Sequence, residues 1–193
     1  MAVQTATKPS LTLKRRIKAP PAKVFAAWTD PEKVKGWMGP GEVKVLKVEC
    51  EPRVGGRYRW LMQSPGGEEH DVSGVYREFV PNQKLVFTWA WKTMPERQSL
   101  VTVDIRPDGD GSLLTLTHEQ FFDEDARDRH QSGWTSALDK MERLFARSSR
   151  GRRFVTIPDY DQSFARSRHR MERASVRSFP CQAARTEHFT GTN

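Results

Sequence analysis

Apolar and polar residues alternate along several short stretches of the chain, a pattern typical of half-buried β-strands. In the first stretch, Leu11, Leu13 and Ile17 share one predicted face with Arg15. The later stretches are separated by turn-forming residues and lie at residues 43–49, 57–63, 72–79, 85–91, 101–105 and 114–118. Strands joined by such short connections predict an antiparallel meander.

Two short helices are predicted between the first and second of these strands. Pro20 and Pro21 end the first strand, and proline is tolerated in a first helical turn because its missing N–H would be unbonded there. Val24 and Trp28 then lie on the apolar face of the first helix. Asp30 is the expected N-cap of a second helix that ends near Trp37.

A longer helix is predicted after Asp123, where apolar and small residues recur at spacings of three and four. Its predicted inner face contains Ala126, His130, Gly133, Trp134, Ala137, Leu138, Met141 and Phe145. A helix with this much apolar surface must pack on another layer, and the sheet is the available partner. The sequence therefore predicts an α+β fold in which a curled antiparallel sheet wraps around a long C-terminal helix.

The apolar periodicity ends at Ala146, and the composition changes with it. From Arg147 to Asn193 the chain holds ten arginines, no lysine and four acidic residues. We therefore expect an N-terminal arm at 1–9, one folded domain at 10–146 and an arginine-rich, mostly disordered tail at 147–193. The tail suggests weak, nonspecific contact with nucleic acid or with an acidic membrane. An altered reading frame in GC-rich DNA would produce a similar composition, and the sequence leaves both explanations open.

Most of the net charge of +8 belongs to this tail, because residues 1–146 hold 22 basic and 20 acidic residues. The body therefore lacks the charge excess of a nucleic-acid-binding domain. The mean hydropathy is −0.72, the first residues lack the apolar core of a signal peptide, and no apolar run would span a bilayer. We expect a cytoplasmic protein whose Cys50 and Cys181 are plain thiols, since their spacing matches no metal or redox motif.

Several segments resemble the START-like superfamily, also called SRPBCC or helix-grip. Within it they are most similar to proteins related to the C-terminal domain of the activator of the Hsp90 ATPase. The similar segments are Ala19–Pro21, Val24–Pro31, Trp37–Pro40, Gly55–Tyr58, Gly74–Tyr76, Leu85–Trp89, Leu116–Glu119 and Gly133–Trp134 followed by Leu138. The resemblance implies a helix-grip cavity for a mostly apolar small molecule. The co-chaperone role is not carried over, because we expect no room in 193 residues for the activator's N-terminal domain.

Large aromatic and methionine side chains fall on the predicted inner faces of strands and helix. They are Trp60, Met62, Trp89, Trp91 and Trp134. Such side chains are usual in small-molecule pockets, but they also supply much of any ordinary core. The sequence leaves both interpretations open, and we take the set as candidate cavity residues.

Three polar residues on the predicted inner faces are further candidates. Arg15 would bind a ligand carboxylate or form a structural ion pair. His118 and His130 would act as acid and base or serve as hydrogen-bonded structural histidines, and the second role is favoured because no partner constellation is visible. Gly133 either admits a ligand or allows tight helix–sheet packing.

The sequence shows no catalytic motif, and neither a metal ion nor another cofactor is expected. His70 stands among acidic residues in what we take as a solvated hairpin tip. The preferred function is binding of a small, partly apolar ligand between the sheet and the C-terminal helix. One alternative is an enzyme acting on a polyketide-like or aromatic substrate in the same cavity, and another is a partner-binding regulatory module.

Overall fold

A single antiparallel sheet of seven strands forms most of the molecule, for which the computed structural model describes residues 8–150. The strands are β1 (Leu11–Ile17), β2 (Lys44–Cys50), β3 (Arg57–Gln63), β4 (Glu69–Val80), β5 (Lys84–Trp91), β6 (Met94–Asp108) and β7 (Gly111–Glu119). Their order in the sheet is β1-β7-β6-β5-β4-β3-β2. Every chain neighbour from β2 to β7 is therefore a sheet neighbour, as in the predicted meander, and β1 closes the order by pairing with β7.

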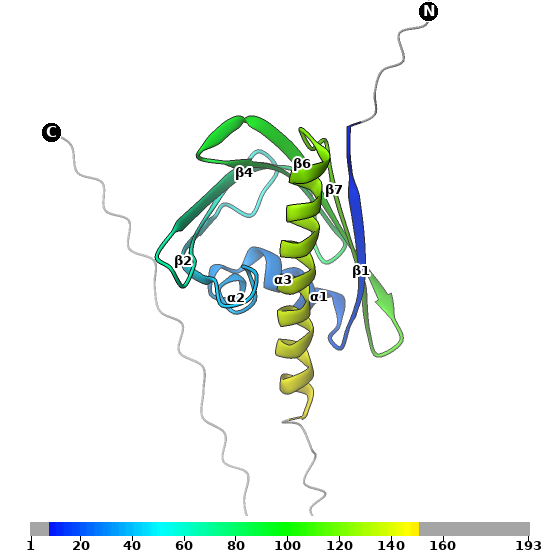
Figure 1. Ribbon diagram of the computed structural model, residues 1–193. Coiled ribbons are helices and arrows are strands. Elements are labelled where there is room, and N and C mark those ends of the chain that lie inside the picture. The colour runs from blue at the N-terminus through cyan, green and yellow to red at the C-terminus, as the bar shows by residue number, and fades with distance from the viewer. Residues whose placement is uncertain (1–7, 151–193) are drawn as a thin grey trace, which may run out of the picture. The chain divides into compact units, whose positions relative to one another are not determined.

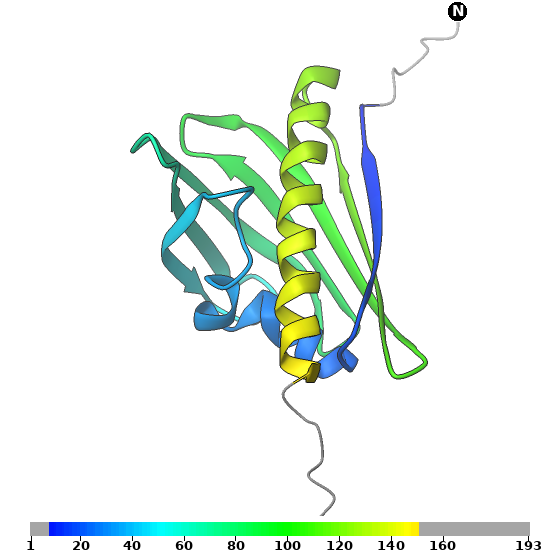
Figure 2. The same cartoon turned by 60° about the horizontal axis from the view of Figure 1, so that its bottom comes forward.

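Three helices cover the concave side of this sheet. They are α1 (Pro21–Thr29), α2 (Pro31–Val34) and α3 (Glu124–Arg150). Asp30 caps α2, because its carboxylate accepts the N–H of Glu32 at 3.1 Å. Figures 1 and 2 show α3 crossing the hollow of the curled sheet, with α1 and α2 near one end. The predicted α+β helix-grip fold is confirmed.

The curvature of the sheet has a local cause in its strand pairing. The register shifts between β2 and β3 at Val45, between β4 and β5 at Tyr76, and between β5 and β6 at Trp89. An extra residue in one strand of a pair bends that strand and increases its twist. α3 lies in this hollow (Figure 1), where its Trp134 and Leu138 are buried.

Several element boundaries differ from the sequence-based predictions. β6 begins at Met94 rather than at Val101. The sequence did not predict this earlier start, because the first residues of β6 are exposed and lack an alternating pattern. His70 lies in β4 and pairs with Met62, so its assignment to a hairpin tip was wrong. The short helix α2 ends at Val34 rather than near Trp37, and the following residues form turns.

The C-terminal helix extends past Ala146 to Arg150. The arginine-rich tail that we predicted lies, from residue 151 onward, outside the described residues. Within residues 8–150, no helix is both long and apolar enough to cross a membrane.

Candidate ligand-binding pocket

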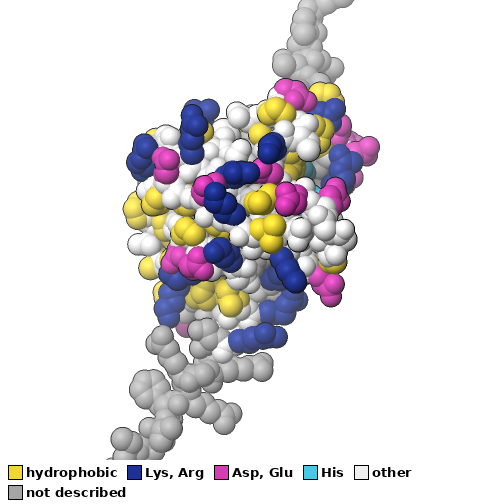
Figure 3. Space-filling model, turned by 90° about the vertical axis from the view of Figure 1, so that its left-hand side faces the viewer, with side chains coloured by type: hydrophobic (Ala, Val, Ile, Leu, Met, Phe, Trp, Pro, Cys, Tyr) yellow, Lys and Arg dark blue, Asp and Glu magenta, His cyan; other side chains and the backbone are white. Residues whose placement is uncertain are grey.

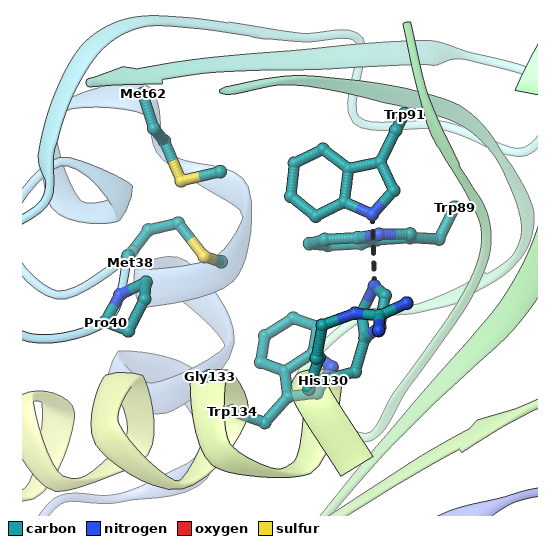
Figure 4. Close-up of a pocket in the computed structure, with 10 residues that line it drawn as sticks. Met38, Pro40, Met62, Trp89, Trp91, His130, Gly133 and Trp134 are labelled. Atoms are coloured by element: carbon teal, nitrogen blue, oxygen red, sulfur yellow. Dashed lines mark hydrogen bonds between the residues drawn. The ribbon is translucent and has the colours of Figure 1, made fainter. Parts of the chain in front are cut away.

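A pocket of about 260 Å³ lies between the sheet and α3. It is lined by Met38, Gly39, Pro40, Met62, Trp89, Trp91, Arg129, His130, Gly133 and Trp134. Figure 4 shows two opposing sides, with the methionines and Pro40 on one side and the tryptophans and His130 on the other. A concave, largely aromatic site of this kind is typical of small-molecule binding.

The periodicities of strand and helix explain why these side chains meet. Trp89 and Trp91 are two positions apart on β5 and therefore face the same side of the sheet. His130, Gly133 and Trp134 are three and four positions apart on α3 and share one helical face. Each element thus directs several side chains into the same space.

Gly133 leaves open space in the wall of the pocket. A Cβ atom built at this position would meet no heavy atom within 4 Å. Tight helix–sheet packing therefore does not explain the glycine, and the alternative that it makes room for a ligand stays a prediction. The glycine costs the helix about 1 kcal/mol relative to alanine.

Packed tryptophan rings form one side of the pocket. The ring centroids of Trp89 and Trp91 are 5.5 Å apart at an interplanar angle of 87°, and those of Trp89 and Trp134 are 5.1 Å apart at 57°. Trp60 packs behind Trp89 with ring centroids 5.7 Å apart. Edge-to-face and tilted contacts at these distances stabilise aromatic clusters.

His130 is held in one neutral form by its two hydrogen bonds. Nε1 of Trp91 donates to Nε2 of His130 over 3.2 Å, as the dashed line in Figure 4 shows. Nδ1 of His130 lies 2.7 Å from the carbonyl oxygen of Ala126 and must donate to it, so Nδ1 carries the proton. Burial lowers the pKa of His130, the hydrogen bond to Ala126 partly opposes this, and the charge of Arg129 lowers the pKa again.

His118 lies behind the pocket wall and is completely buried. Its Nδ1 accepts a hydrogen bond from Nε1 of Trp134 over 3.0 Å. Its Nε2 therefore carries the proton and donates to Oγ of Ser99 over 2.7 Å, and that hydroxyl in turn donates to the carbonyl oxygen of Trp89. Burial holds the pKa of His118 well below its ordinary value, and nearby His130 adds to the effect.

The structure brings together five of the eight candidate cavity residues, which are Met62, Trp89, Trp91, His130 and Trp134. Trp60 and His118 do not line the pocket but support its wall from behind. Arg15 does not line it either. Its guanidinium pairs with Asp139 at 3.3 Å and with Glu142 at 3.1 Å, both on α3.

Sequence reasoning did not select Met38, Gly39, Pro40 or Arg129 as pocket residues. The first three follow α2 in a turn, where no periodicity indicates which side chain faces inward. Arg129 directly precedes His130 on the helix. Its position next to the predicted inner face was the one sequence signal that it lies at the pocket. Among residues 8–150, no group of acidic, histidine and cysteine side chains is arranged to hold a metal ion.

Comparison with known proteins identifies relatives of this fold. The model of the family described as activator of Hsp90 ATPase homolog 1-like protein matches residues 18–146. The AHSA1 protein of Silicibacter pomeroyi is 29% identical with a TM-score of 0.66, and the match covers 72% of this chain and 99% of that one. A protein from Chromobacterium violaceum is 27% identical with a TM-score of 0.65, over 71% and 97% of the two chains. No curated protein sequence matches the chain.

Proposed function

The chain belongs to the family of activator of Hsp90 ATPase homolog 1-like proteins, and we propose that it binds a small, partly apolar molecule in the pocket between the sheet and α3. The observation that carries this proposal is the aromatic pocket itself, with open space beside Gly133. We assign the binding domain to residues 10–146, because the buried hydrophobic residues of the described chain lie between Leu11 and Met141.

Binding is favoured over catalysis by the state of the two histidines. Each ring uses both nitrogens in hydrogen bonds to groups of the protein itself, at Trp91 and Ala126 for His130 and at Trp134 and Ser99 for His118. A general base needs a free lone pair within reach of the substrate. Neither histidine offers one in this arrangement.

Binding inside the pocket is also favoured over docking of a partner protein. On the face drawn in Figure 3, Lys and Arg side chains are interspersed with Asp and Glu and with small hydrophobic areas. Among the described residues, the large exposed hydrophobic side chains belong to separate segments of the chain, at Leu46, Val54, Met94, Phe122 and Leu144. A docking surface is expected to be a continuous apolar patch.

The test is calorimetric titration with 2-naphthol, a neutral two-ring probe at pH 7, on the wild-type protein and on two variants. Gly133→Leu adds an apolar side chain into the open space of the pocket. Ser132→Leu adds the same side chain to an exposed neighbour that does not line the pocket. We expect saturable binding to the wild type and to Ser132→Leu, and loss of binding in a folded Gly133→Leu protein.

Two outcomes would contradict the proposal. One is the absence of saturable binding of 2-naphthol to the wild type, which would mean that side-chain motion closes the pocket. The other is equal binding to both leucine variants, which would place the probe elsewhere on the protein. Thermal unfolding of each variant confirms that binding is compared between folded proteins.

A further inference from the structure

We infer that the pocket takes a flat, two-ring aromatic molecule carrying one carboxylate, whose rings lie between the indoles and the methionines and whose carboxylate pairs with Arg129. This inference rests on the proposed function, because it names the class of ligand for the same pocket. It follows from the shape of the walls, the volume of the pocket and the charge at its edge.

The walls suit the two faces of an aromatic ring system. The indoles of Trp89, Trp91 and Trp134 form one side, and Figure 4 shows the thioethers of Met38 and Met62 on the side opposite. Aromatic rings interact favourably with indoles in offset or edge-to-face geometry, and they make favourable contacts with methionine sulfur. A flat aromatic molecule would gain both kinds of contact at once.

The volume sets the size of the ligand. An engineered apolar cavity of about 150 Å³ holds one benzene molecule. The pocket of about 260 Å³ is less than twice that size. Two fused rings therefore match the volume of the pocket better than a single ring.

Arg129 supplies the charge that distinguishes an acid from a neutral ligand. It is exposed at the pocket and is the one residue of the lining with a full charge, since His130 is held neutral. Within residues 8–150 its guanidinium makes no hydrogen bond or ion pair, whereas that of Arg127, two residues earlier in α3, pairs with Asp128 at 2.7 Å. A free, planar guanidinium binds a carboxylate through two parallel hydrogen bonds.

Acidic residues lie near Arg129, but they have other partners or lie outside the pocket. Glu68, Glu69 and Asp71 share with Arg129 a separate surface hollow. Asp71 is bound by Arg59 at 2.7 Å, and Glu68 is 4.0 Å from Nε2 of His70. None of them forms an ion pair with Arg129 in the described part of the chain, so the guanidinium is available to a ligand.

A cationic ligand is the main alternative, because three indoles also attract cations through their ring faces. Sites of that kind gain from a nearby carboxylate, and no Asp or Glu is among the residues that line this pocket. The positive charge of Arg129 would repel a bound cation. The aromatic cluster and the arginine together therefore favour an anionic aromatic molecule.

The experiment compares three probes of one shape by calorimetric titration at pH 7 and low salt: 2-naphthoate, neutral 2-naphthamide and cationic 2-naphthylmethylammonium. We expect 2-naphthoate to bind about 1.5- to 5-fold more tightly than 2-naphthamide, the range for a solvent-accessible ion pair. We expect the cation to bind most weakly. The preference should shrink as salt is added, since Arg129 is exposed to solvent.

Two variants test whether Arg129 causes the preference for naphthoate over naphthamide. Arg129→Gln should bring the ratio of the naphthoate and naphthamide affinities close to one. Arg143→Gln removes the same charge from an exposed position of α3 that does not line the pocket, and it should keep the ratio. The inference is overturned if naphthamide or the cation binds as tightly as naphthoate, or if the ratio survives in Arg129→Gln. Failure of all three probes would instead overturn the proposed function.

Discussion

Nε1 of Trp134 on α3 donates a 3.0 Å hydrogen bond to Nδ1 of His118 on β7, in the completely buried interior of the domain. This bond requires an unprotonated Nδ1, so it exists only while His118 is neutral. The contact therefore ties the attachment of α3 to the sheet to the protonation state of a histidine.

The first prediction is that acid destabilises the domain. The pKa of His118 in the folded protein lies well below its ordinary value of 6.5, because the ring is buried and His130 is near. The unfolded chain therefore binds a proton below pH 6.5 that the folded protein does not, and stability is complete above this pH and lost below it. His118 alone should lower the free energy of unfolding by about 1.4 kcal/mol per pH unit in the acid range.

Urea denaturation between pH 7.5 and pH 5 measures this slope. His118→Gln keeps a donor and an acceptor but does not titrate, so its slope should be shallower than that of the wild type. His70→Gln changes a histidine of β4 that is hydrogen-bonded to Ser64 and serves as the control. Equal slopes in all three proteins would show that His118 does not control acid stability.

The second prediction concerns Trp134. Trp134→Ala should lower the free energy of unfolding by about 3–5 kcal/mol, because it removes a large buried side chain and leaves a cavity. Trp134→Phe keeps a ring but leaves Nδ1 of His118 without its donor, and it should cost about 1–3 kcal/mol. Leu144→Ala, at a residue of α3 that is 40% exposed, is the control and should change stability little. If the Trp134→Ala variant unfolds at a denaturant midpoint close to that of the wild type, Trp134 does not contribute to the core as we predict.

The third prediction contrasts two glycines. A Cβ atom at Gly74 would overlap the backbone carbonyl oxygen of Thr88 and approach Cε1 of Tyr58 to 2.7 Å. Gly74→Ala should therefore force β4 and β5 apart and cost about 1–3 kcal/mol or more. Gly133→Ala meets no atom and should instead stabilise the domain by up to about 1 kcal/mol. Thermal unfolding measures both. An unchanged or raised stability of Gly74→Ala would contradict the close approach there, and a lowered stability of Gly133→Ala would contradict the open space beside Gly133.

The fourth prediction concerns the ion pairs of Arg15, whose side chain is 22% exposed. Arg15→Met keeps the apolar stem but loses Asp139 and Glu142 as partners, and it should cost about 1 kcal/mol or less. The loss should be smaller in high salt, where these partly exposed charges are screened. Affinity for 2-naphthol should stay unchanged. A weaker affinity in a folded Arg15→Met protein would support the alternative that Arg15 serves the ligand.

Periodicity was enough to predict the fold and the inward direction of most pocket side chains. Alternation in β3 and β5 placed Met62, Trp89 and Trp91 on the concave face, and helical spacing placed His130 and Trp134 on the face of α3 that packs against the sheet. These patterns depend on backbone geometry, which is the same in every strand or helix.

The remaining part of the site depends on tertiary packing, which a local pattern does not contain. Trp60 faces inward as Met62 does, yet Phe87 and Trp89 pack against it and no space remains beside it. Arg15 lies on an inward-facing position of β1, but acidic residues of α3 meet it there. Met38 reaches the pocket from a turn, where side-chain direction follows no repeating pattern.

All six tryptophans of the chain belong to one connected set of ring contacts. From Trp37 the contacts run through Trp28, Trp134 and Trp89, with centroid distances of 4.5, 5.9 and 5.1 Å. Trp89 then contacts both Trp60 and Trp91, at 5.7 and 5.5 Å. At such separations electronic excitation passes between indoles faster than they emit. Excitation of any of the six indoles can therefore reach those beside the pocket, so one quenching molecule bound there would lower the emission of all six.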